Sequence, residues 1–200
     1  MINKIAHIIL AAGSSSRMGT PKQLLPWKKD CLIIHEVKKS LELNLSETYV
    51  VLGANFELIQ KEIIHFPVHV LNNKDWGLGM GSSITFGVRH LINNQIDFDA
   101  ILITLVDQPL IDVSHLSCLI SKFNSNQDKI IATGMKNKIG VPALFPKAHY
   151  QELLELKEDF GARYIIKKYE DDLLVIDGGN RTDDIDTIEQ YNALLEREKE

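Results

Sequence analysis

Residues 7–22 read HIILAAGSSSRMGTPK, a short apolar run that leads directly into a loop of small residues. The HIIL run is typical of a buried strand, because it is short, apolar and bounded by a glycine-containing loop. Gly13 and Gly19 allow the backbone to turn tightly and to approach a ligand closely. Arg17 and Lys22 add two cations that suit phosphate oxygens. The stretch therefore predicts a strand followed by a loop that holds a polyphosphate.

The alternative interpretation of this stretch is a Gly/Ser loop with two solvated cations. The loop matches neither G-x-G-x-x-G nor G-x-x-x-x-G-K-[ST]. The combination of a strand, a small-residue loop, an arginine and a lysine nevertheless favours phosphate binding, since backbone N–H groups and two cations are available together.

Strand-like and helical patterns alternate along the whole chain. Short apolar or β-branched runs predict strands at residues 7–10, 49–52, 68–71, 100–106, 130–132, 141–145 and 173–176. Helical patterns occur at residues 32–43, 56–64, 82–92, 112–123, 147–156, 162–169 and 187–197. The alternation predicts an α/β fold, a three-layer α/β/α Rossmann-like arrangement with a mostly parallel sheet, in which residues 1–200 form a single domain. Ligands of such sheets bind beyond the carboxyl ends of the strands.

A second candidate segment, NNKDWGLGMGSS at residues 72–83, follows the third expected strand and precedes a helix. Three glycines in five positions allow the backbone to approach a flat ligand. Ser82 and Ser83 can cap the helix and offer hydroxyl and N–H groups, which suits the edge of a pyrimidine. The alternative is a plain helix N-terminus with Trp76 as an anchor in the core, and for Trp76 we favour that interpretation.

Asp107 directly follows an expected buried strand of seven apolar residues. An unpaired buried carboxylate is costly, so Asp107 should face a cleft, a cation or hydrogen-bond donors. Mg²⁺ bound to a nucleoside triphosphate takes one or two carboxylates, and Asp107 fits one of these positions. The alternative is a cap on the next helix, but Asp112 is better placed for that role.

Residues 10–27, LAAGSSSRMGTPKQLLPW, resemble the signature of nucleotidyltransferases with the nucleotide-diphospho-sugar transferase fold. They look most like the MobA-like NTP transferases, particularly the molybdenum cofactor cytidylyltransferase group. Residues 72–83 are similar to the family's N-x-x-W-x-x-G-M-G-S-S segment, and residues 106–109 are similar to its V-D-Q-P. The resemblance extends from His7 to about Thr187 and implies the fold of that family.

The resemblance implies a Mg²⁺-dependent enzyme that transfers CMP from CTP to a phosphate-bearing acceptor, a molybdopterin-type compound, with release of pyrophosphate. Ala12 stands where the guanylyltransferase group carries a second glycine, and it favours CTP over GTP, as does Gln108. The implied nucleotide-binding residues are Leu10, Ala11, Ala12, Gly13, Ser14, Ser15, Arg17, Met18, Gly19, Lys22, Gly81, Ser82, Ser83 and Asp107. Of these, Arg17, Lys22 and Asp107 are the implied catalytic residues.

The metal and acceptor sites follow from the same resemblance. Asp107 and Asp186 are the implied Mg²⁺ ligands, with Asp184 as the alternative to Asp186. For this acidic run, the alternative is a solvated helix N-terminus. Residues 140–145 and 158–163 resemble the family's acceptor pocket, although Glu158 replaces the usual glycine. The implied acceptor-binding residues are Gln108, Pro142, Gly161, Ala162 and Arg163; Arg163 either pairs with an acceptor phosphate or pins a helix.

The composition is that of an ordinary globular protein, with 44% hydrophobic and 24% charged residues. Lys and Arg number 22 and Asp and Glu number 27, and the net charge of −5 disfavours nucleic acid and anionic membranes as partners. Cys31 and Cys118 form no metal-binding or disulfide pattern, which indicates a reducing compartment. No long apolar stretch or signal peptide is evident, so we expect a cytoplasmic protein.

Three other functions stay open at this point. The same chemistry could use GTP, or it could use a sugar phosphate or an alcohol phosphate as the acceptor. A protein of a different class would bind a nucleotide without catalysis and deliver cofactor to a molybdoenzyme. Release of pyrophosphate distinguishes the enzymes from the non-catalytic protein.

Overall fold

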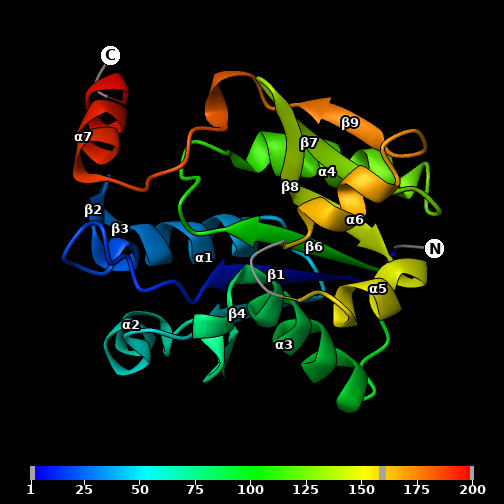
Figure 1. The fold of residues 1–200 in the computed structure, drawn as a ribbon, viewed down its shortest axis with the longest axis horizontal. Helices are drawn as coiled ribbons and strands as arrows, with labels where there is room; N and C mark the ends of the chain where they lie inside the picture. Colours follow the sequence, from blue (N-terminus) through cyan, green and yellow to red (C-terminus); the bar gives the residue numbers. More distant parts are fainter. Residues whose placement is uncertain (1–2, 158–160, 199–200) are drawn as a thin grey trace.

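A central sheet of seven strands organises the chain, which the computed structural model describes over residues 3–157 and 161–198. The strands lie in the order β5-β4-β1-β6-β8-β7-β9 (Figure 1). Their bounds are β1 Ile5–Ala11, β4 Glu47–Leu52, β5 His69–Asn72, β6 Ala100–Leu105, β7 Ile131–Met135, β8 Lys138–Pro146 and β9 Leu174–Asp177. β8 is antiparallel to both of its neighbours, and the other neighbouring strands are parallel. The expected α/β fold with a mostly parallel sheet is confirmed.

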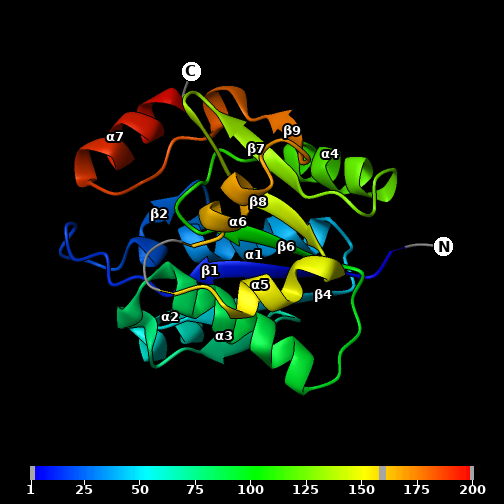
Figure 2. The same cartoon turned by 45° about the vertical axis from the view of Figure 1, so that its right-hand side comes forward.

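Helices cover both faces of the sheet. Their bounds are α1 Leu32–Glu42, α2 Phe56–Ile63, α3 Met80–Asn93, α4 Val113–Asn124, α5 Tyr150–Leu154, α6 Arg163–Lys168 and α7 Ile188–Arg197. α3, α5 and α6 share one hydrophobic cluster with the sheet, whereas α1, α2 and α4 contribute to clusters on its other face. Figure 2 shows α5 and α6 in front of the sheet and α1 behind it. Within residues 3–157 and 161–198, every helix is too short or too polar to span a bilayer.

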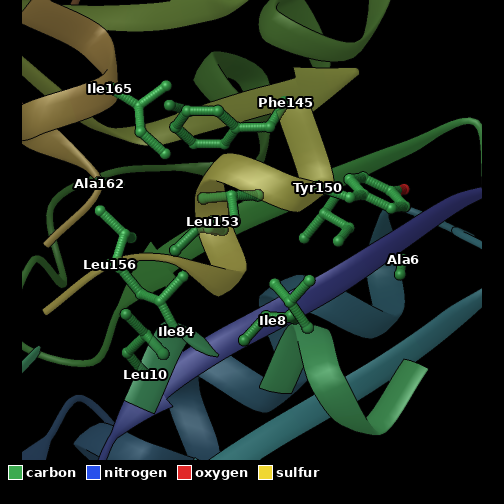
Figure 3. Packing of buried hydrophobic residues seen from close by; sticks show 14 of the residues in the cluster. Ala6, Ile8, Leu10, Ile84, Phe145, Tyr150, Leu153, Leu156, Ala162 and Ile165 are labelled. Carbon is green, nitrogen blue, oxygen red and sulfur yellow. The ribbon is translucent and has the colours of Figure 1, made fainter. Parts of the chain in front are cut away.

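The central strand β1 is buried on both of its faces. Successive side chains of a strand point to opposite faces of the sheet. Ala6, Ile8 and Leu10 therefore pack into the cluster formed with α3 and α5 (Figure 3). Ile9 and Ala11 pack into the cluster formed with α1 and α2. Burial on both faces explains why this strand reads as a nearly continuous apolar run.

Two expected elements differ from the structure. β8 covers Lys138–Pro146 rather than residues 141–145. It is antiparallel because only a two-residue turn, residues 136–137, separates it from β7, and a parallel pairing would need a long crossover. The single helix expected at residues 147–156 is a short 3₁₀ turn, Lys147–His149, followed by the five-residue α5.

The helix caps agree with expectation at α4 but not at α3. Asp112 caps α4, and its carboxylate accepts a hydrogen bond from His115 N at 2.7 Å. The N-cap of α3 is Gly79, with no side-chain cap bond. Ser82 and Ser83 therefore lie inside the first turn of α3 rather than capping it.

A two-stranded hairpin follows the loop after β1, and the sequence pattern does not predict it. Its strands are β2 Pro26–Trp27 and β3 Asp30–Cys31. The Tyr191 hydroxyl of α7 donates a hydrogen bond to Pro26 O at 2.5 Å. The last helix, α7, is thereby attached to the β2–β3 hairpin.

His7 is a buried polar side chain on the α1 face of β1. Its Nδ1 lies 2.6 Å from Ser40 Oγ, and its Nε2 lies 2.9 Å from Thr104 Oγ1. Ser40 Oγ lies in turn 2.7 Å from Thr48 Oγ1. Burial, with a smaller contribution from the Lys39 cation, lowers the pKa of His7 to about 3. The imidazole is therefore neutral in the folded protein and links β1, β4, β6 and α1.

Replacing His7 with glutamine should make the difference in stability from the wild type depend on pH. The unfolded chain protonates His7 near its ordinary pKa of about 6.5, whereas the folded chain keeps it neutral down to about pH 3. Below about pH 6.5, the wild type therefore loses about 1.4 kcal/mol of stability per pH unit through this group. The variant lacks that loss, so its deficit at neutral pH should shrink by about 2 kcal/mol near pH 5. Urea unfolding at both pH values measures the change, and a deficit independent of pH would contradict it.

Candidate active site

Two adjoining cavities open beyond the carboxyl ends of β1 and β6. The first, which we call the loop cavity, has a volume of about 410 Å³ and lies over the loop that follows β1. The second, the side cavity, has a volume of about 270 Å³ and is bounded by the β7–β8 hairpin and the start of α6. Both cavities are lined by Met80, Leu105, Asp107 and Asp186. Two ligands bound side by side would therefore meet at these two carboxylates.

Lys22 joins the two carboxylates at this junction. Its Nζ donates hydrogen bonds to Asp107 Oδ2 at 2.6 Å, to Asp186 Oδ1 at 3.0 Å and to Ile185 O at 2.8 Å. The Lys22 and Asp107 side chains are mostly buried, whereas Asp186 is about half exposed. Ile185 N donates to Asp107 O at 2.9 Å, and this bond holds the segment before α7 against the end of β6.

The charges at the junction depend on one another. Burial lowers the pKa of Lys22, but the Asp107 and Asp186 carboxylates outweigh it, and the net effect raises that pKa. Lys22 is therefore an ammonium ion at neutral pH. Burial raises the pKa of Asp107, and the Lys22 ammonium opposes that rise. Asp107 Oδ1 is buried and has no hydrogen-bond partner among the described residues, so it can still accept a donor or a cation.

Gln23 holds the loop after β1 in shape, although the sequence pattern does not single it out. Its side chain is fully buried, and its Nε2 donates to Ala11 O at 2.8 Å and to Gly13 O at 2.9 Å. Ser15 has a left-handed backbone conformation, and its Oγ accepts from Lys22 N at 2.9 Å. These bonds fix the backbone that lines the loop cavity. A glutamine next to leucines gives no sequence signal, because only the fold decides which carbonyl groups it meets.

Asn73 plays a similar part in the opposite wall of the loop cavity. Its side chain is buried, and its Nδ2 donates to Ser83 Oγ at 3.0 Å and to Ser82 Oγ at 3.1 Å. Its Oδ1 accepts from Asp75 N at 3.0 Å. Asn73 therefore ties the end of β5 to the first turn of α3.

Trp76 lies in the wall of the loop cavity, and its interpretation as a core anchor is wrong. The residue is 37% exposed and lines the cavity together with Gly77 and Gly79. It approaches the backbone at Gly53, where an added Cβ would lie 2.5 Å from Trp76 Cβ and 2.9 Å from Ala12 O. The tryptophan therefore packs sideways against a glycine, which leaves part of its surface open to the cavity.

Eight of the expected nucleotide-binding residues line the loop cavity: Leu10, Ala11, Ala12, Gly13, Ser14, Lys22, Ser83 and Asp107. The other six lie outside this lining. Ser15 is half-buried in the same loop, and Arg17 and Gly19 are exposed there. Met18 packs into the core because a turn closed by Met18 N and Ser15 O directs it inward. Gly81 and Ser82 lie in the first turn of α3, outside the lining.

The expected acceptor residues lie at the side cavity, with one exception. Gln108, Gly161, Ala162 and Arg163 line it. Pro142 does not: it is buried, and its carbonyl accepts a hydrogen bond from Thr133 Oγ1 at 2.7 Å. The preceding residues of β8, Gly140 and Val141, line the cavity in its place. Glu158 lies outside the described residues.

Asp184 and Asp186 have different partners. Asp184 Oδ1 accepts a hydrogen bond from Gln108 Nε2 at 2.8 Å, and its Oδ2 lies 3.7 Å from Lys138 Nζ. Asp186 instead contacts Lys22 and thus pairs with Asp107 at the junction. Asp184 fixes the orientation of the Gln108 amide, because a carboxylate accepts hydrogen bonds and therefore selects the NH₂ end.

The family model for the MobA-like NTP transferase domain matches residues 7–173. The chain belongs to this family. The expected membership is thus confirmed on a match that covers most of the chain, including the loop after β1 and Asp107. Asp186 lies beyond the matched residues.

Relatives of this MobA-like protein carry diverse names. It is 28% identical to "Nicotine blue oxidoreductase" of Paenarthrobacter nicotinovorans, over 96% of each chain. It is 30% identical to "Purine catabolism protein PucB" of Bacillus subtilis, over 94% of each chain. A "Probable molybdenum cofactor guanylyltransferase" of Bacillus mycoides is 28% identical over 65% of this chain and 62% of that protein.

A solved structure supports the fold of the MobA-like chain. The crystal structure of Rv0371c from Mycobacterium tuberculosis superposes with a TM-score of 0.85, at 23% identity, over 96% of this chain and 98% of that one. The nucleotide-diphospho-sugar transferase type of α/β fold is therefore confirmed. The family is one of nucleotidyltransferases, so the expected nucleotidyltransferase family is confirmed as well, whereas the activity of this chain, its nucleotide and its acceptor stay predictions.

Replacing Gln23 with methionine should weaken the binding of a nucleoside triphosphate about tenfold, because two backbone carbonyls of the loop would lose their buried donor. Isothermal titration with CTP and with GTP, together with Mg²⁺, measures the dissociation constants. The matched control is Gln151→Met, which removes an exposed amide whose side-chain partner within residues 3–157 and 161–198 is Glu155. Unchanged affinity in folded Gln23→Met would show that the loop does not need this clamp.

Proposed function

We propose that this protein transfers CMP from CTP to a phosphate-bearing acceptor, a molybdopterin-type compound, and releases pyrophosphate in a Mg²⁺-dependent reaction. One observation carries the proposal: the loop cavity and the side cavity meet at Asp107 and Asp186, with Lys22 between the two carboxylates. A nucleotide over the loop would have its phosphates at this junction. An acceptor in the side cavity would then lie next to them.

The loop cavity offers the groups that a nucleotide requires. Gly13 and Ser14 line it with small residues and backbone N–H groups, which suit phosphate oxygens. Lys22 lines the cavity and supplies positive charge, and Arg17 is an exposed cation of the same loop, outside the lining. Ser83 and the methyl group of Ala12 lie in the same lining, where they would contact the base and ribose. The preference for CTP rests on Ala12, since Gln108 lines the side cavity instead.

The carboxylates at the junction fit a divalent cation bound together with a nucleotide. Asp107 has one buried oxygen to which no described residue donates, and Asp186 is half exposed beside it. In residues 3–157 and 161–198 there is no group of three or more His, Cys, Asp or Glu that could hold a metal. Mg²⁺ with a triphosphate needs only one or two carboxylates, because phosphate and water oxygens complete its octahedron. When bound here, Mg²⁺ would neutralise charge on the reacting phosphates.

The proposed step is an in-line displacement. An oxygen of the acceptor phosphate attacks the α-phosphorus, the new P–O bond forms, and the bond to the β-phosphate oxygen breaks as pyrophosphate leaves. The acceptor phosphate is already ionised at neutral pH, so no strong general base is required. The protein then contributes position and charge: the loop backbone orients the triphosphate, and the Lys22 and Arg17 cations stabilise charge that moves toward the leaving group.

The side cavity suits an acceptor with a flat body and an anionic group. Met135, Ile139 and Val141 give it apolar walls. Arg163 and Lys138 are two cations of its lining, and Lys138 Nζ lies 3.7 Å from the Asp184 carboxylate in the same cavity. Arg163 can hold a phosphate through its planar guanidinium group. A pterin that carries a phosphate combines these two features, which supports a molybdopterin-type acceptor over a simple sugar phosphate.

Pyrophosphate release tests the proposed reaction. The protein is mixed with Mg²⁺, each of CTP, GTP, ATP and UTP, and, in separate reactions, molybdopterin, a sugar phosphate or an alcohol phosphate; we expect release that is fastest with CTP and molybdopterin. Fastest release with GTP would assign the protein to the guanylyltransferases and overturn the inference that Ala12 favours CTP over GTP. Release that requires a sugar or alcohol phosphate would change the acceptor. No release with any nucleotide would favour a non-catalytic partner of a molybdoenzyme.

The variants Lys22→Ala and Asp107→Asn should lower turnover strongly while the fold survives. Loss of a group that stabilises transition-state charge costs about 10² to 10³ in kcat. Asp107→Asn should in addition abolish the dependence of turnover on Mg²⁺. Lys147→Ala removes an exposed lysine that pairs with Asp97 far from the junction, and it serves as the control. Turnover close to that of the wild type in either variant would remove that residue from the mechanism.

A further inference from the structure

Lys22 occupies the space between Asp107 and Asp186 in which a divalent cation would have to bind. Its ammonium group donates to three acceptors, two carboxylate oxygens and the carbonyl of Ile185, at 2.6 to 3.0 Å. A lysine ammonium has three N–H donors, so all of them are in use. Lys22 therefore cannot contact a triphosphate without leaving at least one of these partners.

We propose that Lys22 is an exchangeable counter-ion of the metal site: the divalent cation that arrives with the nucleotide displaces the Lys22 ammonium from the two carboxylates, and the released ammonium binds the phosphates. This inference rests on the proposed function, because it takes a nucleoside triphosphate as the partner. It assigns to one side chain two successive positions in the same reaction cycle.

The charge balance favours such an exchange. Two carboxylates and one ammonium leave a net charge of −1 at a mostly buried junction. A divalent cation balances both carboxylates completely, which leaves the ammonium without a counter-charge. A triphosphate bound over the loop carries several negative charges and could supply one. The metal alone would leave the ammonium without a counter-charge, and the phosphates alone would add negative charge to a junction that is already at −1, whereas the two together give the carboxylates and the ammonium each a partner of opposite sign.

The surroundings of Lys22 permit the movement. Its backbone N–H is held by Ser15 Oγ at 2.9 Å, so the anchor stays in place while the four-carbon side chain reorients. Lys22 also lines the loop cavity, where the phosphates would lie. Asp107 Oδ1 is a buried acceptor without a partner in the part of the chain that the structure describes, so the carboxylate has bonding capacity that Lys22 does not use.

Asp184 does not take part in this exchange. Its carboxylate is already bonded to the Gln108 amide and lies near Lys138. The pair that Lys22 bridges is Asp107 and Asp186, and this pair is the one that the metal would take over.

The exchange predicts that a metal ion alone binds weakly to the wild type, because it must displace the ammonium without help from phosphate. Mn²⁺, followed by electron paramagnetic resonance in the absence of nucleotide and at mildly alkaline pH, serves as the probe. Lys22→Met keeps the length of the side chain and removes its charge, and we expect it to bind Mn²⁺ about tenfold or more tightly than the wild type. Asp107→Asn in the Lys22→Met background should abolish this gain.

The matched control is Lys38→Met. Lys38 donates to both carboxylate oxygens of Asp30 at 2.7 and 2.8 Å, on the exposed side of α1. The variant removes the same charge from a lysine–carboxylate pair elsewhere, so it reports any effect of the net charge alone. Equal gains in Lys22→Met and Lys38→Met, or no gain in Lys22→Met, would overturn the proposal.

A measurement on the wild type tests the exchange even if the Lys22→Met variant fails to fold. With isotope-labelled lysine, the nuclear magnetic resonance signal of the Lys22 ammonium should shift when Mg²⁺ and CTP are added together, and much less when either is added alone. An unchanged signal at saturation would overturn the exchange. Mn²⁺ binding and the ammonium signal are measured without turnover. Absence of pyrophosphate release would therefore contradict the proposed reaction without contradicting the exchange.

Discussion

The buried charge of Asp107 is the constraint on which the rest of the site depends. A carboxylate at the end of an apolar strand is costly unless cations or donors surround it. Lys22, after the first loop, meets this requirement directly, because its Nζ donates to Asp107 Oδ2, and Ile185 N in the segment before α7 donates to the main-chain oxygen of Asp107. Segments that are far apart in the sequence are therefore brought to one point at the edge of the sheet, and the two cavities open on either side of that point.

In the proposed reaction, this arrangement would separate the two substrates without separating the groups that act on them. The loop cavity is lined by small residues, and the side cavity has apolar walls with two cations beside the Asp184 carboxylate. Asp107 and Asp186 belong to both.

The sequence predicts the parts of the site that depend on local spacing. The strand, the glycines, Lys22 and Asp107 are visible because their types and order carry the chemistry. Gln23 and Asn73 are not visible, since a buried amide acquires a role only from the carbonyl or hydroxyl groups that the fold places around it. Trp76 is misjudged for a related reason: an aromatic residue beside glycines is expected to fill the core, but Gly53 gives it a place at the rim instead.

The attachment of α7 to the β2–β3 hairpin couples the two ends of the chain mechanically. The hydroxyl of Tyr191 holds Pro26, and these residues follow shortly after Asp186 and Lys22 respectively. Lys22 and Asp186 thus lie close in the chain to two residues that are hydrogen-bonded to each other. The distance between Lys22 and Asp186 is therefore constrained by their ion pair and, independently, by the Tyr191–Pro26 hydrogen bond. A site built in this way keeps the spacing between the backbone positions of Lys22 and Asp186 when the charges between them are rearranged.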